Sequence, residues 1–411
     1  MTATAVWRET KLGSVLSIKH GFAFLGEYFG DSGSHVVLTP GNFREEGGFA
    51  SKGEKEKWYC GPIPAEYILR EGDLLVAMTE QAEGLLGSSA VVPLNNRYLH
   101  NQRLGLVQLL GDGYSDRRFL YYLFNHKPVR QQIRASASGT KIRHTSPSRI
   151  AEVKALIPDL VTQRRIASIL SAYDELIENC QRRIRILEDM ARGLYREWFV
   201  HFRFPGADAL LCVDSPLGPI PRGWEVRRLD EVLVLQRGFD LPKSERADGS
   251  VPVYAATGIT GFHDEAKVHA PGVVTGRSGT IGEVLYVQED FWPLNTTLWV
   301  KAFPRSEPLF AYFLLGSLGL KQFNSGAAVP TLNRNDVHGI PVVVPPRDVQ
   351  RRFQEITGSM LGQARMLTMK IANLRRTRDL LLPRLLAGQI TLASAESDRA
   401  SSNTASPRAF V

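Results

Sequence analysis

The residues of this chain best suited to chemistry are basic side chains between positions 127 and 154. This stretch holds seven Lys and Arg residues against a single acidic residue, Glu152. Clustered cations are typical of contacts to nucleic-acid phosphates. Arg outnumbers Lys in the whole chain by 37 to 13, which favours planar two-point recognition. We therefore expect an anionic partner, and the alternative interpretation is a solvated surface.

A second group of candidates carries amide and guanidinium groups, which can hydrogen-bond adenine and guanine edges. In the second half of the chain they lie in two polar segments, residues 295–297 and 333–335. The candidate DNA contacts are Lys127, Arg130, Arg134, Lys141, Arg143, His144, Arg149, Asn101, Arg103, Arg277, Asn295, Asn333, Arg334 and Asn335.

Catalytic signatures are weak. The chain has no Gly-Lys dipeptide and hence no P-loop, and it has no Asn/Asp-Pro-Pro-Tyr tetrapeptide. The glycines of residues 276–282 do not have dinucleotide-binding spacing, so we predict a turn between strands there. The nine histidines and three cysteines show no metal-ligand spacing. We predict no catalytic residue and no metal site; a nuclease using Asp248, Glu265 and Lys267 is the least favoured alternative.

Composition describes an ordinary soluble globular protein, with 43% hydrophobic and 22% charged residues and a net charge of +8. The beginning of the chain does not resemble a signal peptide, and the longest apolar stretch, near residues 310–320, is short for a membrane span. We expect a cytoplasmic protein. Basic residues exceed acidic ones by 19 to 16 in residues 1–160 but number 13 against 16 in residues 205–349, which weakens a purely electrostatic argument for DNA binding by the second half.

The elements that carry these residues occur twice. Trp7, Leu12, Val15 and the pair Gly21-Phe22 recur at one nearly constant offset, as Trp224, Leu229, Val232 and Gly238-Phe239. A second echo has a shorter offset and joins Ser138-Gly139 and Gln163-Arg-Arg165 to Ser325-Gly326 and Gln350-Arg-Arg352. Two echoes in the same order indicate one duplicated module with a longer interior in its first copy.

Each copy of the module is followed by a heptad stripe of apolar residues, which predicts a long helix. The second stripe is interrupted at Thr357 and Arg378, and Pro383 is expected to kink the helix or end it at Leu382. Both stripes exceed what one module can cover, so we expect the helices to pack on each other. The predicted seam consists of Ile166, Leu170, Tyr173, Ile177, Ile184, Leu187, Leu194, Phe353, Met360, Leu367, Ile371, Leu374 and Leu381.

The predicted fold class is α+β: two similar mixed α/β domains joined by two long antiparallel helices in a coiled coil. A pseudo-twofold axis, as in isologous dimers, is the reason for expecting an antiparallel pair. Short strands are expected at residues 73–78, 104–108, 272–275 and 297–300, and helices at 119–124 and 310–315. The predicted segments are domain 1 at 1–160, a first spacer helix at 161–204, a Pro/Gly-rich linker at 205–223, domain 2 at 224–349, a second spacer helix at 350–390 and a disordered tail at 391–411.

Three passages resemble the specificity subunit of Type I restriction–modification systems. They are residues 193–206, with the run Gly-Leu-Tyr-Arg-Glu-Trp-Phe, residues 218–225, with Gly-Pro-Ile-Pro-Arg-Gly-Trp-Glu, and residues 374–389 at the end of the second helix. The resemblance covers nearly the whole chain to about residue 390. It implies a non-catalytic DNA-reading subunit with two target-recognition domains, each of which reads half of a split site. The interiors of the two modules differ in length and sequence, so we expect the two half-sites to differ and the target to be asymmetric.

The resemblance also implies the partners of such a subunit: double-stranded DNA, two adenine-methyltransferase subunits and ATP-dependent restriction subunits. S-adenosylmethionine, ATP and Mg²⁺ would then be bound by the partner subunits and none of them by this chain. It offers no short base-contact motif, so the candidate residues above rest on physical reasoning. The alternative function is a coiled-coil adaptor that binds only proteins.

Overall fold

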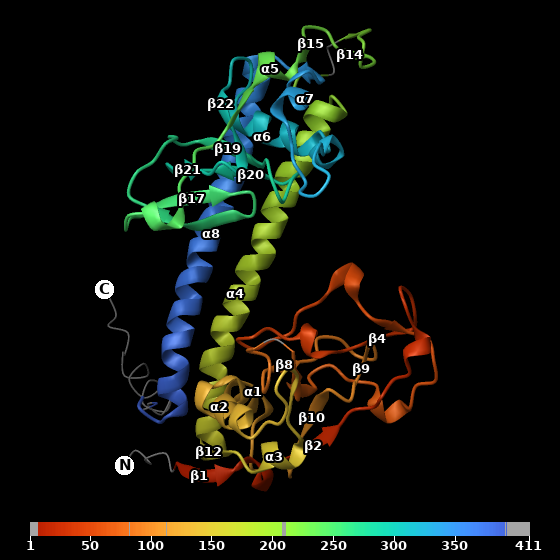
Figure 1. Cartoon of the computed structure of the whole chain (residues 1–411), viewed down its shortest axis with the longest axis vertical. Helices are drawn as coiled ribbons and strands as arrows, with labels where there is room; N and C mark the ends of the chain where they lie inside the picture. Colours follow the sequence, from red (N-terminus) through yellow and green to blue (C-terminus); the bar gives the residue numbers. More distant parts are fainter. Residues whose placement is uncertain (1–6, 82, 112, 208–210, 391, 393–411) are drawn as a thin grey trace, which may run out of the picture. The chain divides into compact units, whose positions relative to one another are not determined.

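The computed structural model describes residues 7–81, 83–111, 113–207, 211–390 and 392 (Figure 1). The chain forms two compact units. The first unit combines the residues up to Glu178 with those from Ala372 onward, and the second consists of Asn179–Ile371. Each unit thus contains one module and a part of both long helices. The predicted tail, residues 391–411, lies outside the described residues except for Leu392.

The first unit is built on a four-stranded antiparallel sheet of order β2-β10-β6-β8. Two-stranded sheets pair β1 with β12 and β7 with β11, and a second four-stranded sheet has the order β3-β5-β4-β9. The strands are β1 Arg8–Lys11, β2 Leu16–His20, β3 Phe29–Gly30, β4 His35–Val37, β5 Trp58–Tyr59, β6 Leu74–Ala77, β7 Thr79–Glu80, β8 Ser89–Val91, β9 Tyr98–Leu99, β10 Leu104–Leu109, β11 Arg143–His144 and β12 Lys154–Ile157, and the short helices are α1 Arg117–Asn125, α2 Lys127–Ala135 and α3 Pro147–Ala151.

The second unit repeats this plan, with a four-stranded sheet of order β16-β22-β19-β20 and the pair β15-β23. A three-stranded sheet, β18-β17-β21, lies beside them, and the predicted linker contains the short pair β13-β14. The elements are β13 Cys212–Val213, β14 Ile220–Pro221, β15 Glu225–Arg228, α5 Leu229–Val232, β16 Val234–Arg237, β17 Val251–Ala255, β18 Gly258–His263, β19 Gly272–Gly276, β20 Val284–Val287, β21 Trp292–Pro293, β22 Thr297–Ala302, α6 Pro308–Ser317, α7 Arg334–His338 and β23 Pro341–Val344.

The strand registers confirm the duplication. Arg8 faces Ile157 in the β1-β12 pair, and Glu225 faces Val344 in β15-β23, which reproduces both offsets found in the sequence. The Gly-Phe echo makes the same contact in both units, because the Phe22 N–H donates to a carbonyl just after β9 and the Phe239 N–H to one at the end of β21. The predicted strands and the two apolar helices, here α1 and α6, are also confirmed.

Two buried glutamines explain the Gln-Arg-Arg echo. The Gln163 side chain donates to the Pro158 carbonyl (2.9 Å) and accepts from the Asp116 N–H (2.9 Å). Gln350 makes the equivalent bonds to the Pro345 carbonyl (2.9 Å) and the Glu307 N–H (2.8 Å). Both are fully buried, so these bonds replace the lost contacts with water. Each fastens the first turn of a long helix to its module.

The two long helices are α4, Leu160–Tyr195, which continues as a π-helical turn over Arg196–Val200, and α8, Arg347–Leu386. In the first unit the start of α4 shares a core with the end of α8, and in the second the end of α4 packs against the start of α8. The helices are therefore antiparallel within each unit, as predicted. Of the predicted seam, Ile166, Leu170, Ile177, Phe353, Leu367 and Ile371 are buried, and Tyr173, Ile184, Leu187, Leu194, Met360, Leu374 and Leu381 are half-buried.

The interruptions in the second stripe have structural explanations. Arg378 pairs with Asp174 of α4 (2.5 Å), and the Tyr122 hydroxyl donates to the same carboxylate (2.6 Å). Thr357 is buried and its hydroxyl donates to the Phe353 carbonyl (2.7 Å). The expectation of a helix end at Leu382 was wrong, since α8 continues through Pro383 to Leu386. The buried Leu385 and Leu386 stabilise this last turn.

No helix in the described ranges is long and apolar enough to cross a membrane.

A buried histidine should make the first unit sensitive to acid. His100 is 0% exposed, its Nε2 lies 2.9 Å from the Leu104 carbonyl, and burial lowers its pKa from 6.5 to about 4. The unfolded chain binds a proton to this group below pH 6.5 and the folded chain does not until about pH 4. The contribution of His100 to stability is therefore lost as pH falls through this window, by up to about 3 kcal/mol.

Urea unfolding of the chain at pH 7 and at pH 4.5 measures this loss. His100→Gln carries no titrating group, so its free energy of unfolding should depend less on pH across the same window. Equal pH dependence of the two proteins would contradict the assignment.

Candidate nucleic-acid interface

The basic stretch 127–154 folds into α2, a hairpin, α3 and β12, and its cations divide into two groups. Arg130 and Arg134, on α2, bind within the protein. The Arg130 guanidinium donates to the carbonyl oxygens of Glu45 and Gly84, and Arg134 pairs with Glu80 (3.6 Å) and Glu83 (2.5 Å). These two arginines stabilise neighbouring loops, and the structure gives no support to their prediction as phosphate contacts.

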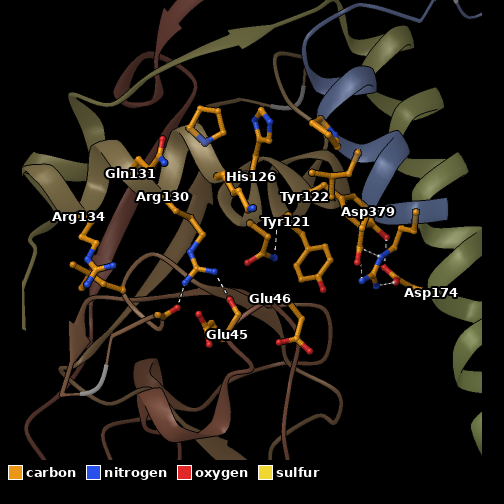
Figure 2. Close-up of a pocket in the computed structure, with 18 of the residues that line it drawn as sticks. Glu45, Glu46, Tyr121, Tyr122, His126, Arg130, Gln131, Arg134, Asp174 and Asp379 are labelled. Atoms are coloured by element: carbon orange, nitrogen blue, oxygen red, sulfur yellow. Dashed lines mark hydrogen bonds and ion pairs between the residues drawn. The ribbon is translucent and has the colours of Figure 1, made fainter. Parts of the chain in front are cut away.

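A pocket of about 810 Å³ lies beside α2 (Figure 2). Five carboxylates line it, and burial raises the pKa of Tyr121, on the same wall, to about 12. The acidic side chains are Glu45, Glu46, Glu80, Asp174 and Asp379, and the basic ones are Lys127, Arg130, Arg134 and Arg378. Three of these cations are already bonded to protein groups, and the carboxylates exceed the cations by one, so the lining offers no excess of positive charge to a phosphate.

Of the remaining cations, Lys127 begins α2 and lines this pocket, and Lys154 begins β12 and pairs with Glu9 (3.7 Å). Three others lie on or beside the hairpin of residues 138–144, which we call the first hairpin. The side chains of Lys141 and Arg143 are exposed, and neither makes a hydrogen bond or an ion pair in the part of the chain that the structure describes. His144 lies 3.1 Å from the Thr79 hydroxyl, and Arg149 donates to the Ser138 hydroxyl (3.0 Å). The first hairpin therefore presents two cationic side chains that have no protein partner among the described residues.

Asn101 and Arg103 lie in the turn between β9 and β10. The Asn101 side chain accepts from the Arg103 N–H (2.9 Å), which fixes the turn. The Arg103 carbonyl accepts from the Met78 N–H (3.0 Å), and the Met78 carbonyl accepts from Thr145, just past the first hairpin (2.9 Å). This turn and the first hairpin thus meet at Met78.

The second unit has a polar groove of about 780 Å³ at the equivalent edge. It brings together the predicted residues Arg277, Asn333 and Arg334. This unit has a hairpin at residues 325–331, which we call the second hairpin. The Leu332 N–H, just past it, donates to the Arg277 carbonyl (2.8 Å), as the Thr145 N–H donates to the Met78 carbonyl in the first unit. Arg277 is therefore the counterpart of Met78. Both units therefore present a hairpin and a β-turn at matched positions, with different side chains.

Several second-unit candidates already have protein partners. Asn295 donates to the Asp240 carboxylate, and its carbonyl accepts from Arg277 (3.1 Å). Asn333 caps α7 by accepting from the Asn335 N–H (3.0 Å). Arg237, which was not among the predicted residues, also lines the groove and pairs with Asp240 (3.5 Å). Arg237 directly precedes the repeated Gly-Phe pair, and this position in the sequence could have marked it as a candidate.

The residues weighed for other chemistry have structural roles. Residues 276–282 form the turn between β19 and β20, as expected. Lys267 pairs with Glu265 (2.6 Å) and lies over the Trp292 ring, 4.8 Å from its centroid. Among the residues that the structure describes, no group of three or more His, Cys, Asp or Glu side chains could hold a metal ion.

Comparisons with known proteins agree with this architecture. A family model described as the Type I restriction modification DNA specificity domain matches residues 5–188 and 221–359. The chain is 24% identical over 296 residues to the Type I restriction enzyme MjaIX specificity subunit of Methanocaldococcus jannaschii, covering 66% of this chain and 68% of that protein. It is 21% identical over 425 residues to the EcoBI specificity subunit of Escherichia coli, covering 94% and 86%.

A solved structure shares the fold. The crystal structure of a Type I restriction–modification S subunit from M. genitalium matches with a TM-score of 0.65 and 18% identity, covering 96% of this chain and 98% of that one.

Proposed function

The chain belongs to the Type I restriction–modification DNA specificity family, and from this premise we propose that each of its units reads one half of a split DNA target. The match to this family confirms the prediction that the chain is a specificity subunit and not an enzyme. It also confirms the predicted role in DNA target recognition. The split of the target is the proposal of this article. It rests on the duplicated module, in which both units present a hairpin and a turn at the same place.

The two halves of the target should differ in sequence. The first hairpin carries Lys141 and Arg143, whereas the second carries Ala328 and Pro330 at the equivalent positions. Different side chains on one scaffold select different base edges, because the bases are distinguished by hydrogen-bond pattern and by the thymine methyl group. The proposed target is therefore asymmetric.

We propose that two adenine-methyltransferase subunits and ATP-dependent restriction subunits assemble on this chain. Exposed apolar side chains on both long helices support such docking, since single-chain packing does not cover them. They are Leu176, Ile186 and Met190 of α4 and Met366, Met369 and Leu380 of α8. S-adenosylmethionine, ATP and Mg²⁺ belong to those subunits in this proposal.

Methylome sequencing of a host that makes this chain with its methyltransferase tests the proposal. We expect one methylated motif made of two unlike parts with a fixed gap between them. A continuous motif, or a palindromic one, would contradict the split asymmetric target.

The charge of the first hairpin should carry much of the salt dependence of binding. Replacing Lys141 and Arg143 with Ala should flatten the slope of log K against log salt concentration by about 2, since each lost phosphate contact removes about 0.9. Titration of a target duplex with the assembled complex at several salt concentrations measures the slope. The exposed pair Lys55 and Lys57, changed to Ala, removes the same charge from another loop and should leave it nearly unchanged. Equal slopes for both double variants would exclude the first hairpin as a specific contact.

A further inference from the structure

One equivalent backbone hydrogen bond closes each of the two hairpins. In the first hairpin the Ser138 N–H donates to the His144 carbonyl (2.9 Å), and in the second the Ser325 N–H donates to the Thr331 carbonyl (2.9 Å). Both pairs are related by the shorter of the two offsets found in the sequence. The same offset relates Ile142 to Val329, so these two side chains occupy the same place in the two units.

A glycine makes each turn possible. A Cβ atom on Gly139 would collide with the Ile142 carbonyl oxygen, and one on Gly326 would collide with the Val329 carbonyl oxygen. Gly139 also has a φ of +98°, in the region that favours glycine. In both turns the residue after the serine must therefore lack a Cβ atom, because the carbonyl oxygen three positions later lies against it.

The sequence between the fixed ends has changed almost completely. After the shared Ser-Gly pair the first hairpin reads Thr-Lys-Ile-Arg-His and the second Ala-Ala-Val-Pro-Thr. Within this span the only shared chemistry is the β-branched aliphatic residue, Ile142 in one and Val329 in the other. Packing does not account for it, because Ile142 is 39% exposed and Val329 is 52% exposed.

Both hairpins are held firmly at their bases. The Thr145 N–H donates to the Met78 carbonyl (2.9 Å) beside the first. In the second, the Gly279 N–H donates to the Pro330 carbonyl (2.9 Å) and the Asn324 side chain accepts from the Thr331 N–H (2.9 Å). Because each tip is already held in place, it loses little conformational entropy when it binds a partner.

We propose that Ile142 and Val329 are equivalent base-reading residues, each contacting the 5-methyl group of a thymine in the major groove of its own half-site. Apolar side chains read DNA through this methyl group, the one apolar feature of the major-groove edges. Cationic groups beside each tip can hold the backbone: Lys141 and Arg143 on the first hairpin, and Arg277 and Arg334 in the groove that the second hairpin borders. This inference rests on the proposed function, since it assumes that the units read DNA.

Deoxyuridine provides the test, because it differs from thymidine only by the missing methyl group. Once methylome sequencing has identified the target, each thymine of the two half-sites is replaced in turn by deoxyuridine. Binding of the assembled complex is then measured by fluorescence anisotropy. One replacement in each half-site should weaken binding by the wild-type complex about fourfold. This factor corresponds to the free energy of burying one methyl-sized group.

Variants connect each methyl group to its side chain. Ile142→Ser should bind the thymine duplex about fourfold more weakly and lose its sensitivity to deoxyuridine in one half-site only. Val329→Ser should lose the sensitivity to deoxyuridine in the other half-site only. Ile142→Val should keep the sensitivity in both half-sites. This non-additivity is the signature of a direct contact. Leu94→Ser and Leu217→Ser, at exposed apolar residues elsewhere in the first and second unit, should keep both sensitivities.

Two failures are distinguishable. If Ile142→Ser and Val329→Ser keep the wild-type response at every thymine, or if the wild type responds at none, the base-reading assignment is overturned while the split target stands. If the complex methylates no split motif, the proposed function itself fails.

Discussion

A heptad inserted into each long helix, after Ile177 in α4 and before Ala372 in α8, should lengthen the gap between the two methylated half-sites by up to about 3 bp. Seven helical residues add about 10.5 Å, and DNA rises about 3.4 Å per base pair. The insertions lie where the first unit gives way to the second. Seven residues preserve the phase of the seam, so each unit should keep its own packing and each half-site its sequence.

Both helices must be extended because they are antiparallel within each unit. An insertion into α4 alone would displace its seam relative to α8 by two turns, and ion pairs such as Asp174–Arg378 could not form together with the second-unit contacts. The single insertion therefore serves as the control and should abolish methylation. Methylome sequencing reads both variants. An unchanged gap in the double insertion would show that the helices do not set the spacing.

The second large effect is expected at Phe353. Phe353→Ala should lower the stability of the second unit by about 3–5 kcal/mol, the usual cost of emptying a buried aromatic site. Its side chain is 0% exposed and lies within 4.9–6.1 Å, between ring centroids, of Tyr195, Trp198, Phe199 and Phe313. These rings join the end of α4, the start of α8 and α6 in one core.

Hydrogen exchange of backbone amides resolves this effect by unit. Amides of β19 and β22 should lose protection in Phe353→Ala, while those of β6 and β10 in the first unit should keep most of theirs. Met369→Ala, at a 55% exposed position on the same helix, should change little. Equal loss of protection in both units would contradict two separate cores.

Much of the fold could be read from local patterns. The two offsets, from Trp7 to Trp224 and from Gln163 to Gln350, revealed the duplicated module, and the heptad stripes predicted both long helices. These features depend on periodicity and on repetition, which survive in the sequence because each buried face repeats its spacing. The helix end expected at Pro383 does not occur, because burial of Leu385 and Leu386 outweighs the hydrogen bond that a proline removes.

The candidate interface was only partly readable. Lys141 and Arg143 were found by composition, and the structure leaves both exposed. Arg130 and Arg134 belong to the same basic stretch, yet their partners, Glu45, Gly84 and Glu80, come from β7 and from loops much earlier in the chain. A charge count cannot detect such distant partners.

The sequence by itself therefore determined the repeated architecture, the paired helices and the family. Only the tertiary structure decided which cations are available to a ligand and which apolar side chains remain exposed. The reason is that exposure and pairing depend on contacts between segments far apart in the chain, whereas periodicity is a property of each segment alone. Ile142 and Val329 are an example. The offset between the two copies of the module in the sequence shows that the two residues are equivalent, but only the folded structure shows that both are exposed.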